Sequence, residues 1–384
     1  MDNSKRVLMS VCNYFNPDNR VFRAANSLAE AGYQVVVLSY SKEGLPEEEE
    51  PGFGFSVKRI KAGFSRFPIK QIRNFVNHIM WRKKTKDFAS QFIPEFVHCH
   101  DYNTLFLGEY CKKKFNSKVI YDNHEYFQDL NYLHRYPFFI RKWIAMYERR
   151  VMKTTVDEMI VVSPGIAEAY TPIFGRKINI VRNIPDTEPY KVFNSGVPDD
   201  ITGFLETQKK IGRKLFLYLG TNTQRGRGMD FCFNLVSVLP NEYGLVIFGP
   251  RDNKEVMLLK QKAIQMGIDE RFGAFKSLPI PVLDKISSYF YMGVSLIEPI
   301  YFSYLHSLPN KLFEYFSMGL PVLSSDIPDQ AELVLRLNLG NVIPFDISKA
   351  KEIIINTGSN SYNPAIKTLF TWESEKKVLL SVYQ

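Results

Sequence analysis

Short apolar runs alternate with amphipathic, helix-like stretches along almost the whole chain. The strand-like runs of the first half are 6–11, 34–39, 96–100, 118–121, 158–162 and 178–181. Those of the second half are 214–220, 244–248, 272–275, 293–297, 321–325 and 341–344. Strands that alternate with helices predict parallel sheets with helices on both faces, so the fold class is α/β.

The alternation stops once, between residues 186 and 212, where Pro, Asp, Asn and Gly accumulate. This segment predicts a linker between two doubly wound, Rossmann-like domains. We expect residues 1–190 and 191–367 to form these two domains, with a C-terminal helix (368–384) packing back on the first domain. Ligands of such sheets bind beyond the carboxyl ends of the strands, so a cleft between the domains is expected.

Composition narrows the class of protein. The chain has 384 residues, of which 45% are hydrophobic, and no apolar run long enough to span a membrane. The first residues lead straight into a strand-like run without a cleavable signal pattern. The cysteines are scattered without CxxC pairs, which suits a reducing compartment and gives no case for a metal site. We therefore expect a cytoplasmic protein.

Positive charge is concentrated in the first half. Residues 1–190 carry a net charge of +7 and residues 191–384 a net charge of +2. The basic residues gather in 70–86 and 141–153, where they alternate with aromatic and aliphatic residues at helical spacing. Such helices can rest on an anionic membrane face, and a solvated helix surface is the alternative. No sequence signature supports nucleic-acid binding.

Residues 307–325, SLPNKLFEYFSMGLPVLSS, form the most informative segment. Ser307 as a cap and Pro309 at the first position predict the start of a helix. Lys311 and Glu314 lie three residues apart on one face of that helix. A lysine in the first turn opposes the helix macrodipole by roughly 0.3–1 kcal/mol, and becomes favourable when an anion lies against the helix start. A solvated Lys–Glu pair is the alternative.

A second candidate loop, 220–228, reads GTNTQRGRG and follows the first strand of the second domain. Its glycines allow a close backbone approach, and Arg225 and Arg227 offer donors suited to phosphate. An arginine and Lys311 from neighbouring loops would clamp a diphosphate without a metal ion. Glu314 could then hold a vicinal diol such as a ribose.

Two loops of the first domain could also carry chemistry. The segment 121–125, YDNHE, ends a strand, and His124 could donate to a sugar hydroxyl or a phosphate oxygen. Arg20, in the Asp-Asn-Arg sequence before the first helix, could orient an acceptor. A structural histidine and a capping turn are the alternatives. No GxGxxG follows the first strand, which disfavours a dinucleotide dehydrogenase.

With these motifs in view, the chain resembles a glycosyltransferase of the GT-B fold, in the large retaining group called family 4. The resemblance covers nearly the whole chain. The segments that carry it are DNRVFRAANSLAEAGYQV, VHCHD (97–101), YDNHE (121–125), 148–168, IVRNIP (180–185), 218–230, 307–326 and 371–383.

The resemblance implies that the first domain (1–190) binds the acceptor and the second (191–367) binds the nucleotide-sugar donor. It also implies roles for individual residues. Arg227 and Lys311 match the diphosphate-binding basic pair, Glu314 the ribose-binding second glutamate of a Glu-x7-Glu motif, and His124 a histidine near the donor sugar. These four are the expected catalytic residues. The expected donor-binding residues are Gly220, Thr221, Arg227, His306, Ser307, Pro309, Asn310, Lys311 and Glu314. No metal and no cofactor are expected.

The sequence departs from the family pattern at two places. His306 stands where the first glutamate of the Glu-x7-Glu motif is expected, which leaves the donor sugar open. The loop after the first strand, CNYFNPDNR, lacks the usual glycines. Asn13 and Arg20 of that loop are the expected acceptor-binding residues.

The expected function is retaining transfer of a hexose from a UDP- or GDP-sugar to an acceptor hydroxyl of a saccharide or a lipid-linked acceptor. Cell-surface polysaccharide or lipopolysaccharide assembly is the expected context, at the inner membrane face. A sugar-nucleotide epimerase of the same fold and a catalytically silent partner subunit are the alternatives. The sequence does not specify the linkage or the oligomeric state.

Overall fold

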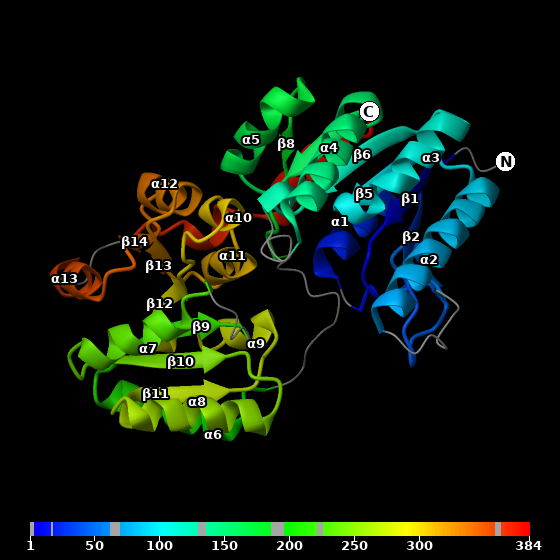
Figure 1. Cartoon of the computed structure of the whole chain (residues 1–384). Helices are drawn as coiled ribbons and strands as arrows, with labels where there is room; N and C mark the ends of the chain where they lie inside the picture. Colours follow the sequence, from blue (N-terminus) through cyan, green and yellow to red (C-terminus); the bar gives the residue numbers. More distant parts are fainter. Residues whose placement is uncertain are drawn as a thin grey trace. The chain divides into compact units, whose positions relative to one another are not determined.

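Two mainly parallel β-sheets, each flanked by helices, organise the chain (Figure 1). The computed structural model describes residues 4–16, 18–61, 70–129, 136–185, 196–220, 226–357 and 362–384. Unit 1 comprises Met1–Arg182 and Glu373–Gln384, and unit 2 comprises Asn183–Trp372.

The sheet of unit 1 has the strand order β3-β4-β2-β1-β5-β6-β7-β8, with β3 antiparallel to β4 and the other pairs parallel. Its strands are β1 (Arg6–Ser10), β2 (Gln34–Tyr40), β3 (Glu48–Glu49), β4 (Phe55–Ile60), β5 (Phe96–His100), β6 (Lys118–Asn123), β7 (Glu158–Val161) and β8 (Asn179–Ile180). The strand order reverses at β1, which pairs with both β2 and β5. The loops after β1 and β5 therefore emerge at a topological switch point, where ligands of such sheets bind.

Helices cover the sheet of unit 1 and close its core. They are α1 (Asn19–Glu30), α2 (Lys70–Phe92), α3 (Leu105–Phe115), α4 (Phe138–Thr154), α5 (Pro164–Phe174) and the C-terminal α14 (Trp372–Ser381), with short 3-10 turns η1 (Tyr102–Thr104) and η2 (Phe127–Asp129). Buried side chains of α3 and α4, such as Leu107 and Val151, pack with those of β5 and β6, such as Val97 and Val119. This packing fixes the strand ends that carry the polar residues discussed below.

Unit 2 repeats the pattern with the strand order β11-β10-β9-β12-β13-β14, and its paired strands are all parallel. Its strands are β9 (Lys214–Leu219), β10 (Tyr243–Phe248), β11 (Phe272–Phe275), β12 (Phe290–Ser295), β13 (Val322–Ser325) and β14 (Gly340–Ile343). Its helices are α6 (Asp199–Lys210), α7 (Met229–Val238), α8 (Asn253–Gln265), α9 (Ile280–Asp284), α10 (Phe302–Leu305), α11 (Asn310–Ser317), α12 (Pro328–Arg336) and α13 (Ile347–Thr357), with 3-10 turns η4 (Asp269–Arg271), η5 (Ser287–Tyr289) and η6 (Ile366–Thr368).

The C-terminal segment contacts unit 1 through polar and aromatic side chains. Lys376 Nζ lies 2.7 Å from Glu30 Oε2, and the Arg182 guanidinium pairs with the buried Glu375. The Tyr33 hydroxyl donates to the Tyr383 carbonyl over 3.3 Å. Residues far apart in sequence therefore close one face of this unit.

The expected strands lie within one to three residues of the observed ones, apart from β3 and β4, which the apolar pattern did not single out. Helix α1 starts at Asn19 because Asp18 caps it, accepting from the Val21 N–H over 3.2 Å. Over the described ranges, no helix is both long and apolar enough to cross a bilayer.

Candidate active site

The candidate donor site of unit 2 lies where its strand order reverses. Strand β9 pairs with β10 on one side and with β12 on the other. The segment after β9 leads into α7, and the segment after β12 leads through α10 into α11. Because β9 and β12 are neighbours, the two segments start beside each other although about eighty residues separate them in sequence. This pairing brings the Arg227 and Lys311 segments together.

The turn that holds Arg227 requires a glycine on either side. Gly226 and Gly228 have φ values of +90° and +73°. A Cβ at Gly226 would lie 2.7 Å from the Tyr304 ring, and one at Gly228 would lie 2.6 Å from the Leu296 carbonyl oxygen. Both the backbone conformation and the close packing therefore exclude larger residues. The sequence GRG is thus a structural requirement for placing Arg227 at the start of α7.

The Arg227 side chain is held by aromatic contacts. Its guanidinium carbon lies 5.2 Å from the centre of the Tyr304 ring, within cation–π range. The Tyr218 hydroxyl donates to the Arg227 carbonyl over 3.0 Å. Arg227 Nε is buried and has no hydrogen-bond partner among the described residues. The group is therefore oriented but keeps a donor available for a ligand.

Lys311, in the first turn of α11, approaches the same place from the other segment. Its Nζ lies 4.4 Å above the Tyr218 ring, and Tyr218 is also the residue that holds the Arg227 backbone. Burial and the positive charge of Arg227 lower the pKa of Lys311 to about 8, although Cys232 and Glu314 act in the opposite direction. Neither Arg227 nor Lys311 forms a salt bridge with any residue that the structure describes. An anion bound between them would relieve this unfavourable charge.

Glu314 lies one turn further along α11 and is half-buried. Its carboxylate is near enough to Lys311 to favour the charged ammonium. The Lys–Glu pair expected from the sequence is therefore electrostatically coupled in the structure. A carboxylate only accepts hydrogen bonds, so Glu314 could accept them from vicinal hydroxyl groups.

The start of α11 differs from the prediction in one respect. Pro309, and not Ser307, occupies the N-cap position, and the helix begins at Asn310. The Ser307 hydroxyl donates instead to the Tyr304 carbonyl over 2.9 Å, closing the turn after α10. The Ser307 cap was a wrong prediction because the hydroxyl has a nearer acceptor in the preceding turn. Asn310 is exposed, and its side-chain oxygen accepts from Asn183 Nδ2 over 2.6 Å.

His306 stands at the end of α10 and is paired with a carboxylate. Its Nδ1 lies 3.0 Å from Asp329 Oδ2, and the Asp329 side chain, from α12, is almost completely buried. The His306 ring also packs against Phe302, with ring centres 4.6 Å apart. A histidine–aspartate pair thus occupies the position where the resemblance implies a single glutamate.

The other residues predicted for the donor site lie directly after β9, where the structure describes only part of the segment. Gly220 directly follows β9; its φ is +133°, and its N–H donates to the Phe248 carbonyl over 2.9 Å. Thr221 and Arg225 lie outside the described residues. For Gly220 the structure shows a backbone bend at the carboxyl end of the central strand, where the backbone can approach a ligand.

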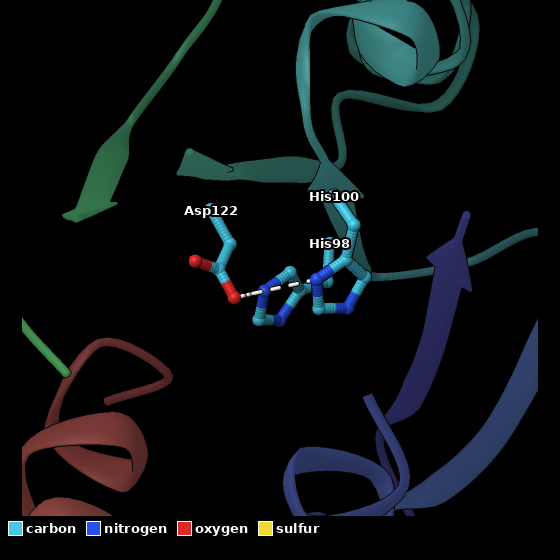
Figure 2. A group of neighbouring side chains, drawn as sticks. All are labelled: His98, His100 and Asp122. Atoms are coloured by element: carbon cyan, nitrogen blue, oxygen red, sulfur yellow. Dashed lines mark hydrogen bonds and ion pairs between the residues drawn. The ribbon is translucent and has the colours of Figure 1, made fainter. Parts of the chain in front are cut away.

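In unit 1, a buried cluster of histidines and aspartate lies on β5 and β6 (Figure 2). His98 and His100 are completely buried, two residues apart on β5, so both point to the same face of the sheet. Their rings stack with centres 4.3 Å apart. Both reach Asp122 Oδ2 on the paired strand β6, at 3.3 Å from His98 Nε2 and 3.3 Å from His100 Nδ1.

His124 joins this cluster from the loop after β6. Its Nε2 lies 3.5 Å from Asp122 Oδ2 and its Nδ1 lies 3.5 Å from Asp101 Oδ2. Asp101 also accepts from the backbone N–H of His124 over 3.1 Å. Two carboxylates therefore fix both the ring and the backbone of the residue that the sequence singled out.

The electrostatics of the cluster favour a charged aspartate and a charged His124. Burial tends to raise the pKa of Asp122. His124, His100 and His98 outweigh this effect and together hold the pKa of Asp122 well below its ordinary value. Burial and Arg20 tend to lower the pKa of His124, yet Asp101 and Asp122 outweigh them and raise it. An imidazolium at the end of β6 could donate to a hydroxyl or a phosphate oxygen.

His98 is the neutral member of the group. Burial, together with His100, lowers its pKa to about 4 despite the opposing effect of Asp122. Since Asp122 only accepts hydrogen bonds, His98 donates from Nε2 and accepts at Nδ1 from the Tyr383 hydroxyl, 2.5 Å away. The C-terminal segment thereby fixes the tautomer of a histidine on the central strands.

The donor atoms of His98, His100 and Asp122 could hold a metal ion, since they lie within 4.8 Å of one another. Histidine nitrogens with one carboxylate oxygen form a ligand set that Zn²⁺ accepts. However, a metal-bound histidine ordinarily donates its second N–H, and His100 Nε2 is buried without a hydrogen-bond partner within the described ranges. The arrangement therefore fits a hydrogen-bonded network better than a metal centre.

The two acceptor-site predictions lie near each other at the start of α1. Asn13 is exposed, and its Nδ2 donates to the capping residue Asp18 over 2.7 Å. Arg20 is half-buried and lies near enough to His124 for its charge to oppose protonation there. The capping turn and the basic side chain expected as alternatives thus coexist, and Arg20 and His124 belong to one polar region.

Sequence reasoning did not assign roles to the residues that support this region. Asp101, His98 and His100 enter the sequence analysis only within the VHCHD segment and Tyr218 only within 218–230, whereas Tyr304 lies in none of its segments. Histidines two residues apart on one strand were a usable signal, because that spacing places both on the same face. The two tyrosines gave no local signal, since their positions depend on strand pairing.

A family model and solved structures both match the chain. Residues 18–189 match the family described as Glycosyltransferase Family 4. No curated protein matches the chain by sequence.

The solved structures match the full length at low identity. A sucrose-phosphate synthase from Thermosynechococcus elongatus is 16% identical with a TM-score of 0.71, over 99% of this chain and 95% of that one. Anabaena HepE in complex with UDP and glucose is 11% identical with a TM-score of 0.68, over 98% of each chain. WaaG, a glycosyltransferase involved in lipopolysaccharide biosynthesis, is 14% identical with a TM-score of 0.59, over 97% of this chain and 94% of that one. The chain is therefore a protein of the GT-B glycosyltransferase fold whose residues 18–189 match Glycosyltransferase Family 4.

Proposed function

We propose that this protein is a retaining glycosyltransferase that moves a hexose from a UDP- or GDP-sugar to an acceptor hydroxyl. The match to Glycosyltransferase Family 4 and the GT-B fold support the enzyme class. The nucleotide-sugar donor binds mainly to unit 2 and the acceptor mainly to unit 1. Cell-surface polysaccharide or lipopolysaccharide synthesis at the cytoplasmic membrane face is the proposed context, which the structural similarity to WaaG supports.

One observation carries the proposal: two cations from neighbouring loops converge in unit 2, and neither forms a salt bridge with a described carboxylate. Tyr218 contacts both residues: its hydroxyl donates to the Arg227 carbonyl, and the Lys311 ammonium lies over its ring. The proximity of Arg227 also helps to lower the pKa of Lys311. A diphosphate would neutralise both charges and accept hydrogen bonds from the guanidinium and the ammonium. Glu314 would hold the ribose of the same nucleotide.

The chemistry follows from placing the diphosphate at this pair. The bond between the anomeric carbon and the diphosphate oxygen breaks, and the acceptor oxygen bonds to that carbon from the same face, so the configuration is retained. The departing diphosphate takes the proton of the acceptor hydroxyl. Arg227 and Lys311 stabilise the negative charge that grows on the diphosphate, and this selectively lowers the transition-state energy.

In unit 1, His124 is proposed to donate to a donor-sugar hydroxyl or to the diphosphate. Asp101 and Asp122 raise its pKa and fix its ring, so it is prepared to donate. Arg20 and Asn13 are proposed to contact the acceptor. His306, with Asp329 behind it, is proposed to contact the donor sugar in place of the missing glutamate.

The transfer is proposed to need no metal ion, because Arg227 and Lys311 provide the positive charge that a divalent cation would supply. Dialysis against EDTA, followed by assay with and without added Mg²⁺ or Zn²⁺, checks this. Unchanged turnover after chelation is expected. Activity restored only by a metal would contradict the charge assignment.

The direct test is a thermal-shift screen against nucleoside diphosphates and their sugars. A ligand that binds the folded state raises the unfolding midpoint by mass action. UDP or GDP should stabilise the wild type and fail to stabilise Lys311→Ala, whereas Lys254→Ala, an exposed lysine of α8, should respond as the wild type does. Equal stabilisation of Lys311→Ala would show that the cation pair does not bind the diphosphate.

A catalytically silent partner subunit is the second candidate, because His306 and its bound Asp329 stand where a donor-contacting glutamate is expected. Calorimetry separates the two candidates. Failure to bind any UDP or GDP would favour the silent subunit. Nucleotide binding together with sugar transfer to an acceptor would exclude it.

A further inference from the structure

Helix α4 (Phe138–Thr154) of unit 1, labelled in Figure 1, carries several large apolar side chains that are exposed to solvent. The exposed fractions of Phe138, Phe139, Trp143 and Met146 are 70%, 70%, 64% and 56%. Their spacing places them along one side of the first half of the helix. Large aromatic side chains gathered in this way on one face mark an interaction surface.

The same face also carries basic side chains along its length. Lys142, Arg149, Arg150 and Lys153 are exposed, and Glu148, the sole acidic residue of α4, is completely buried. Arg150 is partly compensated by Glu109, 2.8 Å away. The exposed face of α4 therefore combines aromatic groups with positive charge and contributes no carboxylate.

The other basic segment expected to meet a membrane is arranged differently. In α2, Trp81 is completely buried, and the Arg82 guanidinium lies 4.3 Å above the Phe106 ring. Lys84 Nζ donates to the Lys61 carbonyl over 2.8 Å. These α2 residues are thus engaged in contacts within unit 1, whereas the aromatic residues of α4 are turned outward.

We infer that the α4 face, defined by Phe138, Phe139, Lys142, Trp143, Met146, Arg149 and Lys153, is the surface by which unit 1 docks on an anionic lipid membrane. Aromatic side chains enter the interfacial region of a bilayer, and adjacent lysines and arginines bind acidic headgroups. Charge complementarity selects this occupant. A second copy would bring the same basic residues against each other, which is unfavourable.

The test uses the full-length protein and vesicles of pure phosphatidylcholine or of phosphatidylcholine mixed with phosphatidylglycerol. Of the three tryptophans, Trp81 is completely buried, Trp372 is 8% exposed and Trp143 is 64% exposed. A blue shift of the emission on binding therefore reports chiefly on Trp143. We expect co-sedimentation and a blue shift with the mixed vesicles, and much weaker binding to pure phosphatidylcholine.

Variants then separate the apolar and the charged contributions. Phe138→Ser with Phe139→Ser should lower partitioning at least roughly tenfold, because two exposed aromatic groups no longer insert. Lys142→Gln and Lys153→Gln should each lower it roughly fivefold. The matched control is Met257→Ser with Leu258→Ser on α8, which are 61% and 55% exposed but lie in unit 2 and should leave partitioning unchanged.

Several results would overturn the inference. These are equal binding to both vesicle types, no sedimentation with either, or equal losses in the α4 and α8 variants. Lipid-free dimerisation that Phe138→Ser with Phe139→Ser abolishes would assign the face to a second copy instead. Membrane binding is measured without donor, and nucleotide stabilisation is measured without lipid, so failure of either leaves the other result standing.

Discussion

The polar centres of the two units differ in how their charge is balanced. In unit 2, Arg227 and Lys311 converge without a salt bridge to any described carboxylate, and Lys311 has a pKa lowered to about 8. In unit 1, Asp122 contacts three histidines, and the charges largely compensate one another within the fold. The contrast agrees with the proposal that unit 2 binds an anionic ligand, whereas the polar group of unit 1 positions His124.

The largest expected effect concerns the Arg227–Lys311 pair of unit 2. Lys311→Ala should reduce turnover roughly 100–1000-fold, about 3–4 kcal/mol, because one donor to the developing diphosphate charge is lost. Steady-state assays with a nucleotide-sugar donor measure this effect. Lys254→Ala is the matched control on an exposed helix face. Undiminished turnover in a folded Lys311→Ala protein would show that Lys311 does not stabilise the charge on the diphosphate.

A substitution in the histidine–aspartate cluster of unit 1 should change the free energy of unfolding. Asp122→Asn removes the charge that three histidines share in a buried setting, and should lower the free energy of unfolding by roughly 3 kcal/mol. Denaturant titration measures the change. Asp284→Asn, an exposed surface pair with Lys367, should change it by less than about 1 kcal/mol. Similar small changes in both variants would show that the cluster is not held by charge.

The pH dependence of nucleotide binding sharpens the contrast. Lys311 of the free protein loses its proton above about pH 8, so binding a diphosphate then requires proton uptake. Affinity for UDP or GDP should fall by up to about tenfold per pH unit above that value. Lys311→Arg, which stays protonated, should flatten the profile, and calorimetry across the pH series measures both.

The lowered pKa of Lys311 also affects the stability of the free protein, but in the opposite direction: affinity falls with rising pH, whereas stability rises. Between about pH 8 and the ordinary lysine value of 10.5, the unfolded chain binds more protons than the folded chain at this position. The contribution of Lys311 to stability should therefore increase as pH rises through this window. A contribution that decreases in this window would indicate a hidden partner for the ammonium.

The smallest expected effect concerns the link between the C-terminus and the histidine cluster. Tyr383→Phe removes the hydroxyl that donates to His98 Nδ1, and should lower the free energy of unfolding by about 1 kcal/mol. Turnover should change little, since Asp101 and Asp122 still hold His124. Tyr33→Phe, which removes a more exposed hydroxyl bonded to the same segment, is the control. A large loss of turnover in Tyr383→Phe would show that the C-terminal segment controls the function of the histidine–aspartate cluster.

The sequence by itself determined the alternating strands and helices, the helix that carries Lys311 and Glu314 though not its cap, and the GRG turn around Arg227. These features follow from local periodicity and from residue-specific backbone preferences, which a short segment expresses alone. Only the tertiary structure decided that β9 lies beside β12 and β5 beside β6. Those pairings bring Arg227 to Lys311 and three histidines to Asp122, and tertiary packing leaves the aromatic residues of α4 outside while burying Trp81 of α2. The reason is that strand order and helix docking depend on burial summed over many distant residues, which no local pattern encodes.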